Sequence, residues 1–341
     1  MQSGMSYRVV QWTTGNVGDR SVKAVLDNPD LELVGVYAWS PDKVGTDVGG
    51  VTATDDVDAL LALAPDCVIY NPKWPDADEL VRILEAGVNV VTTAAFITGH
   101  ALGRDRIEDA CLRGGSTIFG SGMNPGFANL LALVSAGICD RIDSITVTES
   151  VDSTGYDSGD TEMSVGYGRP IDDPELPAMV ERGTAVFGDA VHLMADALGV
   201  ELDEIRCVAE FAQTTDFLDL GSWSIDAGCV AGVAASWQGR REGRTVIELK
   251  VRWRKGQTLE PDWKVEHGYL VDIQGQPCVR TRLDIFPGKD FVARSFQDYM
   301  VLGMIITSLP AVNAIPAVCA AAPGIVTYAD LPLITGRGFV T

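Results

Sequence analysis

Apolar and polar residues follow two alternating patterns along roughly the first 140 positions of the chain. Short apolar runs, typical of buried strands, are separated by segments in which apolar residues recur at helical spacing. The expected strands are Tyr7–Trp12, Leu31–Ala38, Asp66–Asn71, Val88–Thr93 and Ser116–Gly120, and the expected helices are Asn16–Leu26, Asp76–Ala86, Arg104–Arg113 and Gly126–Gly137. Strands that alternate with helices predict βαβ units and an α/β domain with a Rossmann-type parallel sheet.

The pattern changes near Arg141, where longer strand-like runs begin. The expected strands are Ile142–Val151, Glu204–Gln213, Gly221–Gln238, Thr245–Trp253, Trp263–Ile273 and Cys278–Phe286, with a polar loop at Asp152–Pro170, one long helix at Glu175–Leu198 and helical structure again from Phe291 to Ala322. This favours an α+β domain with a mostly antiparallel sheet and one covering helix. We therefore expect a dinucleotide-binding domain at 1–138, a substrate and dimerisation domain at 139–295, and a C-terminal helical segment at 296–341 that returns to the first domain.

Charge and composition narrow the classes of partner. The 341 residues carry a net charge of -21, which repels phosphate backbones and anionic lipid surfaces. We expect a small-molecule substrate, no nucleic acid and no membrane. The most apolar stretch, Val301–Val326, contains Pro310, Pro316 and Pro323, which favours buried core helices over a membrane span. Seven cysteines without a CxxC pair and three dispersed histidines predict no metal site and a cytoplasmic protein.

The first strand runs into Thr13-Thr14-Gly15-Asn16-Val17-Gly18, and a helix then begins. This is a dinucleotide fingerprint whose first glycine is replaced by Thr13. Gly15 would let the backbone approach a pyrophosphate, and Gly18 would allow tight packing of helix on strand. The N–H groups of Asn16 and Val17 would point at phosphate from the helix N-terminus. The alternative interpretation is an ordinary turn between a strand and a helix.

The end of the second strand bears on the choice of cofactor. An acidic residue there would bind the ribose 2′-hydroxyl of NAD, but this chain continues Ala38-Trp39-Ser40-Pro41-Asp42-Lys43. Ser40 can donate a hydrogen bond to a 2′-phosphate, Lys43 can supply charge, and Trp39 can stack on adenine. Asp42 keeps NAD in consideration. The sequence favours NADP(H) over NAD(H).

Separated motifs support a family resemblance. They are VVQWTTGNVGDRSV at the first turn, GVNVVTT at Gly87–Thr93, GSGMNPGF at Gly120–Phe127 and AVNAIPAVCAAAPGIVTYADLP at Ala311–Pro332. The chain resembles the dihydrodipicolinate reductase N-terminal-domain family, and more closely the branch of 2,4-diaminopentanoate dehydrogenase and native amine dehydrogenases, including actinobacterial members. The resemblance implies an NAD(P)-dependent oxidoreductase that passes hydride from nicotinamide to a C=O or C=N carbon. It also implies that Asn71-Pro72, Thr93-Ala94-Ala95 and Asn124-Pro125-Gly126 surround the nicotinamide.

One departure from that branch concerns the catalytic chemistry. A glutamate that follows the VVTT-like strand in amine dehydrogenases corresponds here to Ala95, and an apolar side chain cannot hold an ammonium ion. We expect reduction of a ketone or imine of small to medium size. Two alternatives stay open: an active amine dehydrogenase that uses another carboxylate, and a non-catalytic NADP(H)-binding sensor.

Substrate-side candidates lie in and after the segment Glu149–Arg169. Glu149 or Asp152 would serve as general acid or base if partly buried, Tyr156 or Tyr167 as proton donor, and Arg169 as a substrate anchor. The competing interpretation is a solvated acidic loop. His192, inside the expected long helix, is a further candidate for the pocket. Trp223, Trp237, Trp253 and Trp263 on the expected strands suggest a homodimer interface or sheet core.

Overall fold

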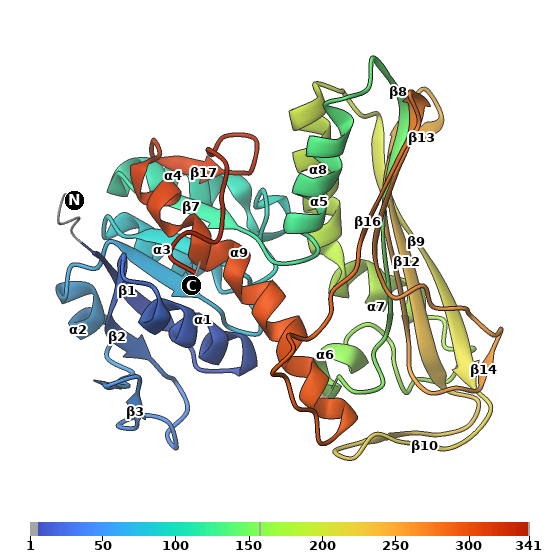
Figure 1. The fold of residues 1–341 in the computed structure, drawn as a ribbon, viewed down its shortest axis with the longest axis horizontal. Coiled ribbons are helices and arrows are strands. Elements are labelled where there is room, and N and C mark those ends of the chain that lie inside the picture. Colours follow the sequence, from blue (N-terminus) through green and yellow to red (C-terminus); the bar gives the residue numbers. More distant parts are fainter. Residues whose placement is uncertain (1–5, 157, 340–341) are drawn as a thin grey trace. The chain divides into compact units, whose positions relative to one another are not determined.

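The computed structural model describes residues 6–156 and 158–339 and divides into two compact units (Figure 1). Unit 1 contains residues 1–127 and 301–341, and unit 2 contains residues 128–300. These divisions fall close to, but not at, the borders expected from the sequence at 138 and 295. Where the independently folding domains end stays a prediction.

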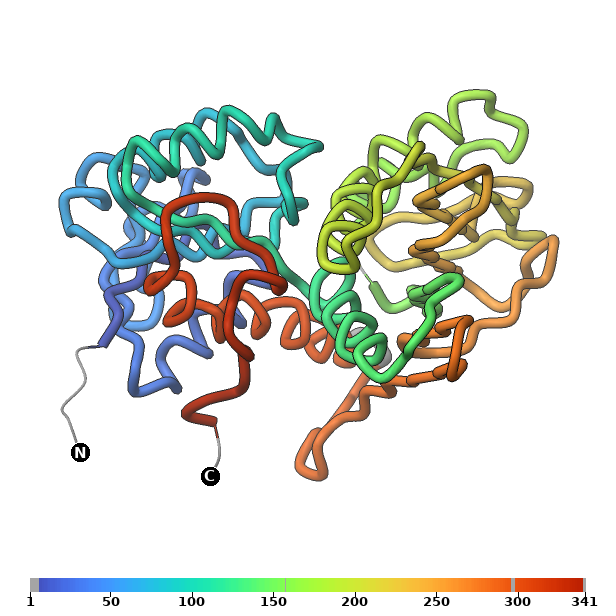
Figure 2. Tube along the Cα trace, turned by 90° about the horizontal axis from the view of Figure 1, so that it is seen from above, coloured from blue at the N-terminus to red at the C-terminus, as the bar shows by residue number. Residues whose placement is uncertain are grey.

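Unit 1 contains a six-stranded parallel sheet. Its strands are β1 (Tyr7–Trp12), β2 (Leu31–Tyr37), β5 (Cys67–Tyr70), β6 (Asn89–Thr92), β7 (Thr117–Gly120) and β17 (Gly324–Val326), in the order β17-β7-β6-β5-β1-β2. The predicted Rossmann-type sheet is confirmed. Strand β17 was not expected, because a run of three residues after Pro323 is too short to show a hydrophobic period. Figure 2 shows this last segment, in red, running back to the strands of unit 1.

Helices cover both faces of this sheet. Helices α1 (Asn16–Asp27) and α9 (Met300–Ala320) lie on one face, and α2 (Val57–Ala62), α3 (Ala77–Glu85) and α4 (Arg104–Gly114) lie on the other (Figure 1). A short hairpin, β3 (Asp47–Val48) and β4 (Val51–Thr52), follows β2. The apolar core on the α2–α4 side includes Trp12, Tyr70 and Ile107, each fully shielded from solvent.

Helix α9 corrects one detail of the sequence interpretation. Pro310 and Pro316 lie inside a continuous 21-residue helix and do not end it. Among the described residues this is the one helix with the length and composition of a membrane span, although 39% of its most apolar window is buried inside the protein. Its Ser308 hydroxyl is 2.8 Å from the Ser21 hydroxyl of α1, which is a contact of a core helix. The expected absence of a membrane partner stays a prediction.

Unit 2 contains a seven-stranded mixed sheet. Its strands are β8 (Arg141–Asp152), β9 (Glu204–Thr214), β12 (Val230–Arg241), β13 (Arg244–Arg254), β14 (Leu259–Glu260), β15 (Gly268–Gln276) and β16 (Val279–Leu283), in the order β14-β9-β12-β13-β8-β15-β16. Only β13 and β8 pair in parallel, so the prediction of a mostly antiparallel sheet is confirmed. A separate two-stranded hairpin joins β10 (Leu218–Asp219) to β11 (Ser224–Ile225). The expected strand at Gly221–Gln238 was therefore too long, because a turn divides it before β12.

The helices of unit 2 also differ from expectation. They are α5 (Phe127–Ala136), α6 (Gly159–Met163), α7 (Leu176–Gly183) and α8 (Ala185–Leu198). The single long helix expected at Glu175–Leu198 is two helices that divide at Thr184, whose hydroxyl bonds the Val180 carbonyl and accepts from the Trp237 indole. The expected loop at Asp152–Pro170 contains α6.

The tryptophans do not gather on one open face of the sheet. Trp237 and Trp253 lie on the face covered by α8, where Trp237 meets Gly188 and Trp253 lies 6.3 Å from the Phe187 ring. Trp263 lies on the opposite face, over Gly232 and 5.8 Å from the Arg252 guanidinium. Two of the four residues that suggested a homodimer are therefore core. The dimer itself stays a prediction.

Candidate functional site

In unit 1, the predicted cofactor residues lie at the carboxyl ends of the parallel strands. The sheet order reverses direction between β1 and β5, because β2 follows on one side of β1 and all later strands on the other. Ligands of open α/β sheets bind in the crevice outside the strand ends at such a switch point. The two flanking strand ends, Thr13–Gly15 and Asn71-Pro72, meet here.

The first turn has the geometry of a phosphate-binding loop. Thr13 adopts φ +73, the left-handed conformation for which the fingerprint ordinarily uses glycine. A Cβ on Gly18 would lie 2.5 Å from the Thr13 carbonyl oxygen, so only glycine allows α1 this close to the turn. A Cβ on Gly15 would meet nothing within 4 Å. The backbone at Gly15 is therefore open, and the N–H groups of Asn16 and Val17 begin a 12-residue helix beside it.

A buried chain of hydrogen bonds holds the turn against the neighbouring strand ends. The Gln11 side-chain amide donates to the Thr13 carbonyl at 2.8 Å and to the Asn71 amide oxygen at 2.9 Å. Asn71 in turn donates to the Thr93 hydroxyl at 2.8 Å. The Ser21 hydroxyl, in α1, lies 3.2 Å from the same Asn71 oxygen. Asn71 and Thr93, both predicted cofactor residues, are thus part of the scaffold that orders the turn.

The loop after β2 brings three predicted residues close to the first turn. Trp39 exposes 71% of its surface. Lys43 donates from its ammonium to the Thr14 carbonyl at 2.8 Å. The Ser40 hydroxyl donates to Asp42 and lowers the pKa of that carboxyl, with a smaller contribution from Lys43. The positive and negative groups therefore lie side by side at this strand end.

The loops after β6 and β7 are packed closely together. A Cβ on Gly120 would lie 1.8 Å from the Phe96 carbonyl oxygen, so the two backbones are in contact. Ala94 is buried, and Ala95 is exposed with φ +43. Asn124 and Pro125 are half-buried in the turn that follows β7. The Ser121 hydroxyl lies 2.7 Å from Tyr328, which follows β17.

These observations fit a bound nicotinamide dinucleotide. Open backbone at a helix N-terminus suits the pyrophosphate, and the exposed Trp39 suits a flat base. The residues predicted from the sequence to hold the cofactor, which stay a prediction, are Thr14, Gly15, Asn16, Val17, Gly18, Trp39, Ser40, Lys43, Asn71, Pro72, Thr93, Ala94, Asn124 and Pro125. Once bound, the cofactor supplies the hydride, and the protein supplies orientation and electrostatics.

In unit 2, both carboxylates expected to act in catalysis already have partners. Glu149 lies in β8 on the helix-covered face and accepts a hydrogen bond from the Trp253 indole at 2.8 Å. Its charge, together with the larger effect of burial, raises the pKa of the Tyr269 phenol beside it. Asp152 accepts from the Thr154 backbone at 3.0 Å and from the Thr154 hydroxyl at 2.5 Å. Asp152 therefore shapes the turn that leaves β8.

The other two catalytic candidates lie at different ends of the sheet. Tyr167 is 2% exposed, and the backbone next to it, at Gly168, bonds to Val230 at the start of β12. Burial raises the pKa of the Tyr167 phenol well above its ordinary value, so the hydroxyl stays protonated. His192 is half-buried in α8, and its neighbour Val191 contacts the position of Gly239, near the far end of β12. Arg169 is exposed and pairs with Asp173.

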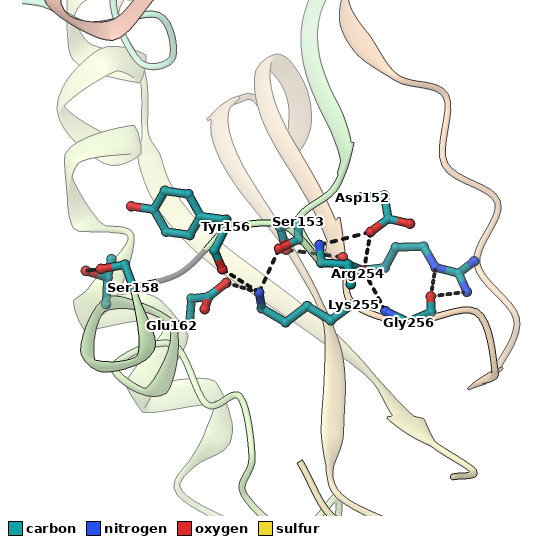
Figure 3. A network of polar contacts seen from close by, with 10 residues as sticks. Asp152, Ser153, Tyr156, Ser158, Glu162, Arg254, Lys255 and Gly256 are labelled. Carbon is teal, nitrogen blue, oxygen red and sulfur yellow. Dashed lines mark hydrogen bonds and ion pairs between the residues drawn. The ribbon is translucent and has the colours of Figure 1, made fainter. Parts of the chain in front are cut away.

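An ion pair that the sequence did not suggest joins Glu162 to Lys255 (Figure 3). Glu162 in α6 and Lys255 after β13 are both buried, with 2.6 Å between carboxylate and ammonium. Lys255 continues the alternation of β13, in which Leu249 and Val251 are buried. The alternation of every second residue, continued from Val251, was the signal in the sequence that Lys255 is buried. A lysine that follows a strand is, however, ordinarily expected to be exposed to solvent. Asp157, in the same segment, lies outside the described residues.

Comparison with known proteins identifies the family. The profile of the 2,4-diaminopentanoate dehydrogenase C-terminal domain matches residues 128–337. The chain belongs to this family. An amine dehydrogenase of Streptomyces virginiae is 33% identical, with 81% of this chain and 84% of that protein covered. The 2,4-diaminopentanoate dehydrogenase of Acetoanaerobium sticklandii is 26% identical, with 96% and 93% covered.

A solved structure supports the fold of the whole chain. The structure of an amine dehydrogenase from Mycobacterium smegmatis aligns with a TM-score of 0.79 at 20% identity, and covers 97% of this chain and 98% of that one. The family resemblance predicted from the sequence is confirmed, as is the prediction of an NAD(P)-dependent oxidoreductase.

Proposed function

We propose that this family member transfers hydride from NADPH to the C=O or C=N carbon of a small to medium neutral substrate. The observation that carries the proposal is the open backbone at Gly15, held at the switch point of the unit 1 sheet by the Gln11–Asn71–Thr93 chain. A phosphate-binding turn supported in this way positions a dinucleotide. Reduction of a ketone then consumes one hydride and one proton and yields an alcohol.

We assign the proton-donating hydrogen bond to Tyr167. Its buried phenol stays protonated across the working pH range, because desolvation disfavours the phenolate. Such a group can donate a hydrogen bond to the carbonyl oxygen of the substrate, whereas burial disfavours the phenolate that full transfer of its proton would leave. Glu149, Asp152 and His192 are secondary candidates, since Glu149 and Asp152 are already engaged and His192 lies towards the other end of β12.

Ammonia chemistry is less well supported. Ala95 presents no carboxylate at the end of β6, and the carboxylate of Glu162 is neutralised by Lys255 at 2.6 Å. An ammonium ion needs an uncompensated acceptor, so these side chains favour a carbonyl or imine substrate. The alternative is an amine dehydrogenase that uses another carboxylate. The second alternative is a non-catalytic NADP(H) sensor, which would keep the same turn.

The test is NADPH oxidation with 2-hexanone, acetophenone and 5-oxohexanoate, each with and without ammonium chloride. We expect turnover of the neutral ketones without ammonium. Turnover that requires ammonium would contradict the proposal and favour the amine dehydrogenase. Micromolar binding of NADPH with no turnover of any carbonyl compound would favour the sensor.

We also propose that NADP(H) is preferred to NAD(H). Lys43 supplies positive charge beside the first turn, and the neighbouring ionised Asp42 limits the preference. Replacing Lys43 by Met is expected to weaken NADPH binding about tenfold, or ~1.4 kcal/mol, with little change for NADH. Replacing Asp42 by Asn is expected to shift the ratio in the opposite direction. Fluorescence titration of both cofactors checks this, and NADH binding as tight as NADPH binding in the wild type would refute it.

Two further expectations concern the state of the protein. We propose a homodimer, because one face of the unit 2 sheet carries half-buried and exposed residues such as Val208. We also propose a cytoplasmic location, since this chemistry uses a cytoplasmic cofactor pool and the seven cysteines are free. Sedimentation at several protein concentrations tests the dimer.

A further inference from the structure

Two cysteines that are distant in the sequence lie together at one edge of the unit 1 sheet. Cys67 is the first residue of β5 and is fully buried, and Cys319 is the last residue but one of α9 and is half-buried. The Cys319 thiol donates to the Asp66 carbonyl at 3.6 Å, across 253 positions of sequence. Because Asp66 directly precedes Cys67, this contact brings the two cysteines to neighbouring positions in the fold.

The two thiols also interact with each other. Burial, and after it a hydrogen bond with the Cys319 thiol, raises the pKa of Cys67 well above its ordinary value, so Cys67 is a protonated thiol at neutral pH. Both cysteines are free in the structure. Two thiols in hydrogen-bond contact need only a small movement of their side chains to reach the length of a sulfur–sulfur bond.

We propose that Cys67 and Cys319 form a peroxide-sensitive dithiol site, whose disulfide joins the end of α9 to the start of β5. The pair lies at the amino end of β5, whereas the proposed cofactor site lies at the carboxyl ends of the parallel strands. Disulfides of cytoplasmic proteins are ordinarily transient, because the compartment returns them to thiols. The reduced pair is therefore the resting state, and the disulfide forms under oxidation.

The different exposure of the two sulfur atoms sets the order of the steps. Cys319 is the thiol that hydrogen peroxide reaches from solvent, and its thiolate attacks one peroxide oxygen. The O–O bond breaks, which leaves a sulfenic acid on Cys319 and releases water. The Cys67 sulfur then displaces the hydroxyl group from the Cys319 sulfur, and that hydroxyl leaves as water with the Cys67 proton. In sum, two thiols and one hydrogen peroxide give one disulfide and two waters.

The disulfide is expected to stabilise the protein and to leave cofactor binding unchanged. It closes a loop that contains most of the chain, and a cross-link over a long loop removes conformational freedom from the unfolded state. Helix α9 places Ser308 beside Ser21 of α1 and Cys319 beside the start of β5. The cross-link therefore forms at the edge of the sheet that is remote from the first turn, where NADPH is proposed to bind.

The first experiment treats the native protein with hydrogen peroxide, blocks the remaining thiols with iodoacetamide and maps disulfides by mass spectrometry of a non-reduced digest. We expect one pair of peptides joined at Cys67 and Cys319, which separates after treatment with dithiothreitol. In urea the same oxidation is expected to give several other pairs, because the selectivity comes from the fold. Native Cys319 that is oxidised to a sulfinic acid without a cross-link, or is joined to another cysteine, would overturn the inference.

The second experiment measures thermal denaturation before and after peroxide. We expect the melting temperature of the wild type to rise by about 5 °C on oxidation and to return on reduction. Cys319→Ser and Cys67→Ala each remove one partner, so peroxide is expected to leave their melting temperatures unraised. Cys278→Ser is the matched control, because Cys278 is an exposed cysteine of unit 2, and it is expected to respond as the wild type does. An equal rise in Cys319→Ser would assign the stabilisation to other cysteines and contradict the proposal.

Discussion

Replacing Gly15 by valine is expected to weaken NADPH binding by about 100-fold, or ~2.7 kcal/mol, while the protein stays folded. Gly15 has φ −85 and ψ −174, an extended conformation that valine adopts readily. A Cβ there meets nothing within 4 Å, so the fold has room for the side chain. The branched methyl groups would occupy the space in front of the first-turn N–H groups, where the pyrophosphate is proposed to bind.

Fluorescence titration with NADPH and thermal denaturation together test this expectation. The loss of a favourable N-cap residue accounts for about 1 kcal/mol of stability or less. Gly288→Val is the matched control, because Gly288 is exposed and a Cβ there also meets nothing within 4 Å. If Gly15→Val bound NADPH with wild-type affinity, the proposal that the pyrophosphate binds at this turn would be wrong.

Replacing Gly120 by alanine is expected to destabilise the protein by about 3 kcal/mol. The added Cβ would lie 1.8 Å from the Phe96 carbonyl oxygen and 2.6 Å from its carbon, and both are backbone atoms that cannot rotate away. Relief requires a shift of the loop after β6, which carries Ala94 and Ala95. NADPH affinity is therefore expected to fall together with stability.

Gly122→Ala is the control for this substitution. Two positions further along the same segment, its Cβ would have an ordinary contact of 3.6 Å with the Pro125 carbonyl oxygen, and a change within about 0.5 kcal/mol is expected. Urea denaturation of both variants measures the difference. Equal stability of Gly120→Ala and the wild type would mean that the β6 and β7 loops are less tightly joined than described.

The local period of the sequence was sufficient for most elements of unit 1. Buried parallel strands are short apolar runs between helical segments, and β1 was predicted with its observed ends. The hydrophobic period of the sequence failed to predict those elements that form because of tertiary contacts. Strand β17 has three residues and exists because it pairs with β7, far away in the sequence. The break at Thr184 depends on a side chain that bonds Trp237, 53 positions away.

The cofactor turn was predictable for a related reason. The glycines at positions 15 and 18 indicate that the backbone there has no room for a side chain or must stay accessible. At Gly18 the structure shows the close packing that the sequence predicted. The left-handed Thr13 was not predictable, since threonine rarely adopts this conformation. Its carbonyl accepts from the Gln11 side chain, which also bonds Asn71, 60 positions away, and such contacts leave no local signal in the sequence.

The sequence by itself determined the two-part α/β architecture, the dinucleotide turn and the family, because these depend on short-range periodicity and on motifs of a few residues. Tertiary structure alone decided which polar side chains of unit 2 are hydrogen-bonded or ion-paired within the protein, and which are buried. It engaged Glu149 and Asp152, left the Tyr167 hydroxyl buried, and brought Lys255 to a carbonyl 102 positions away. The physical reason is that burial and charge pairing depend on distances in space, which the chain sets only when the sheet has formed.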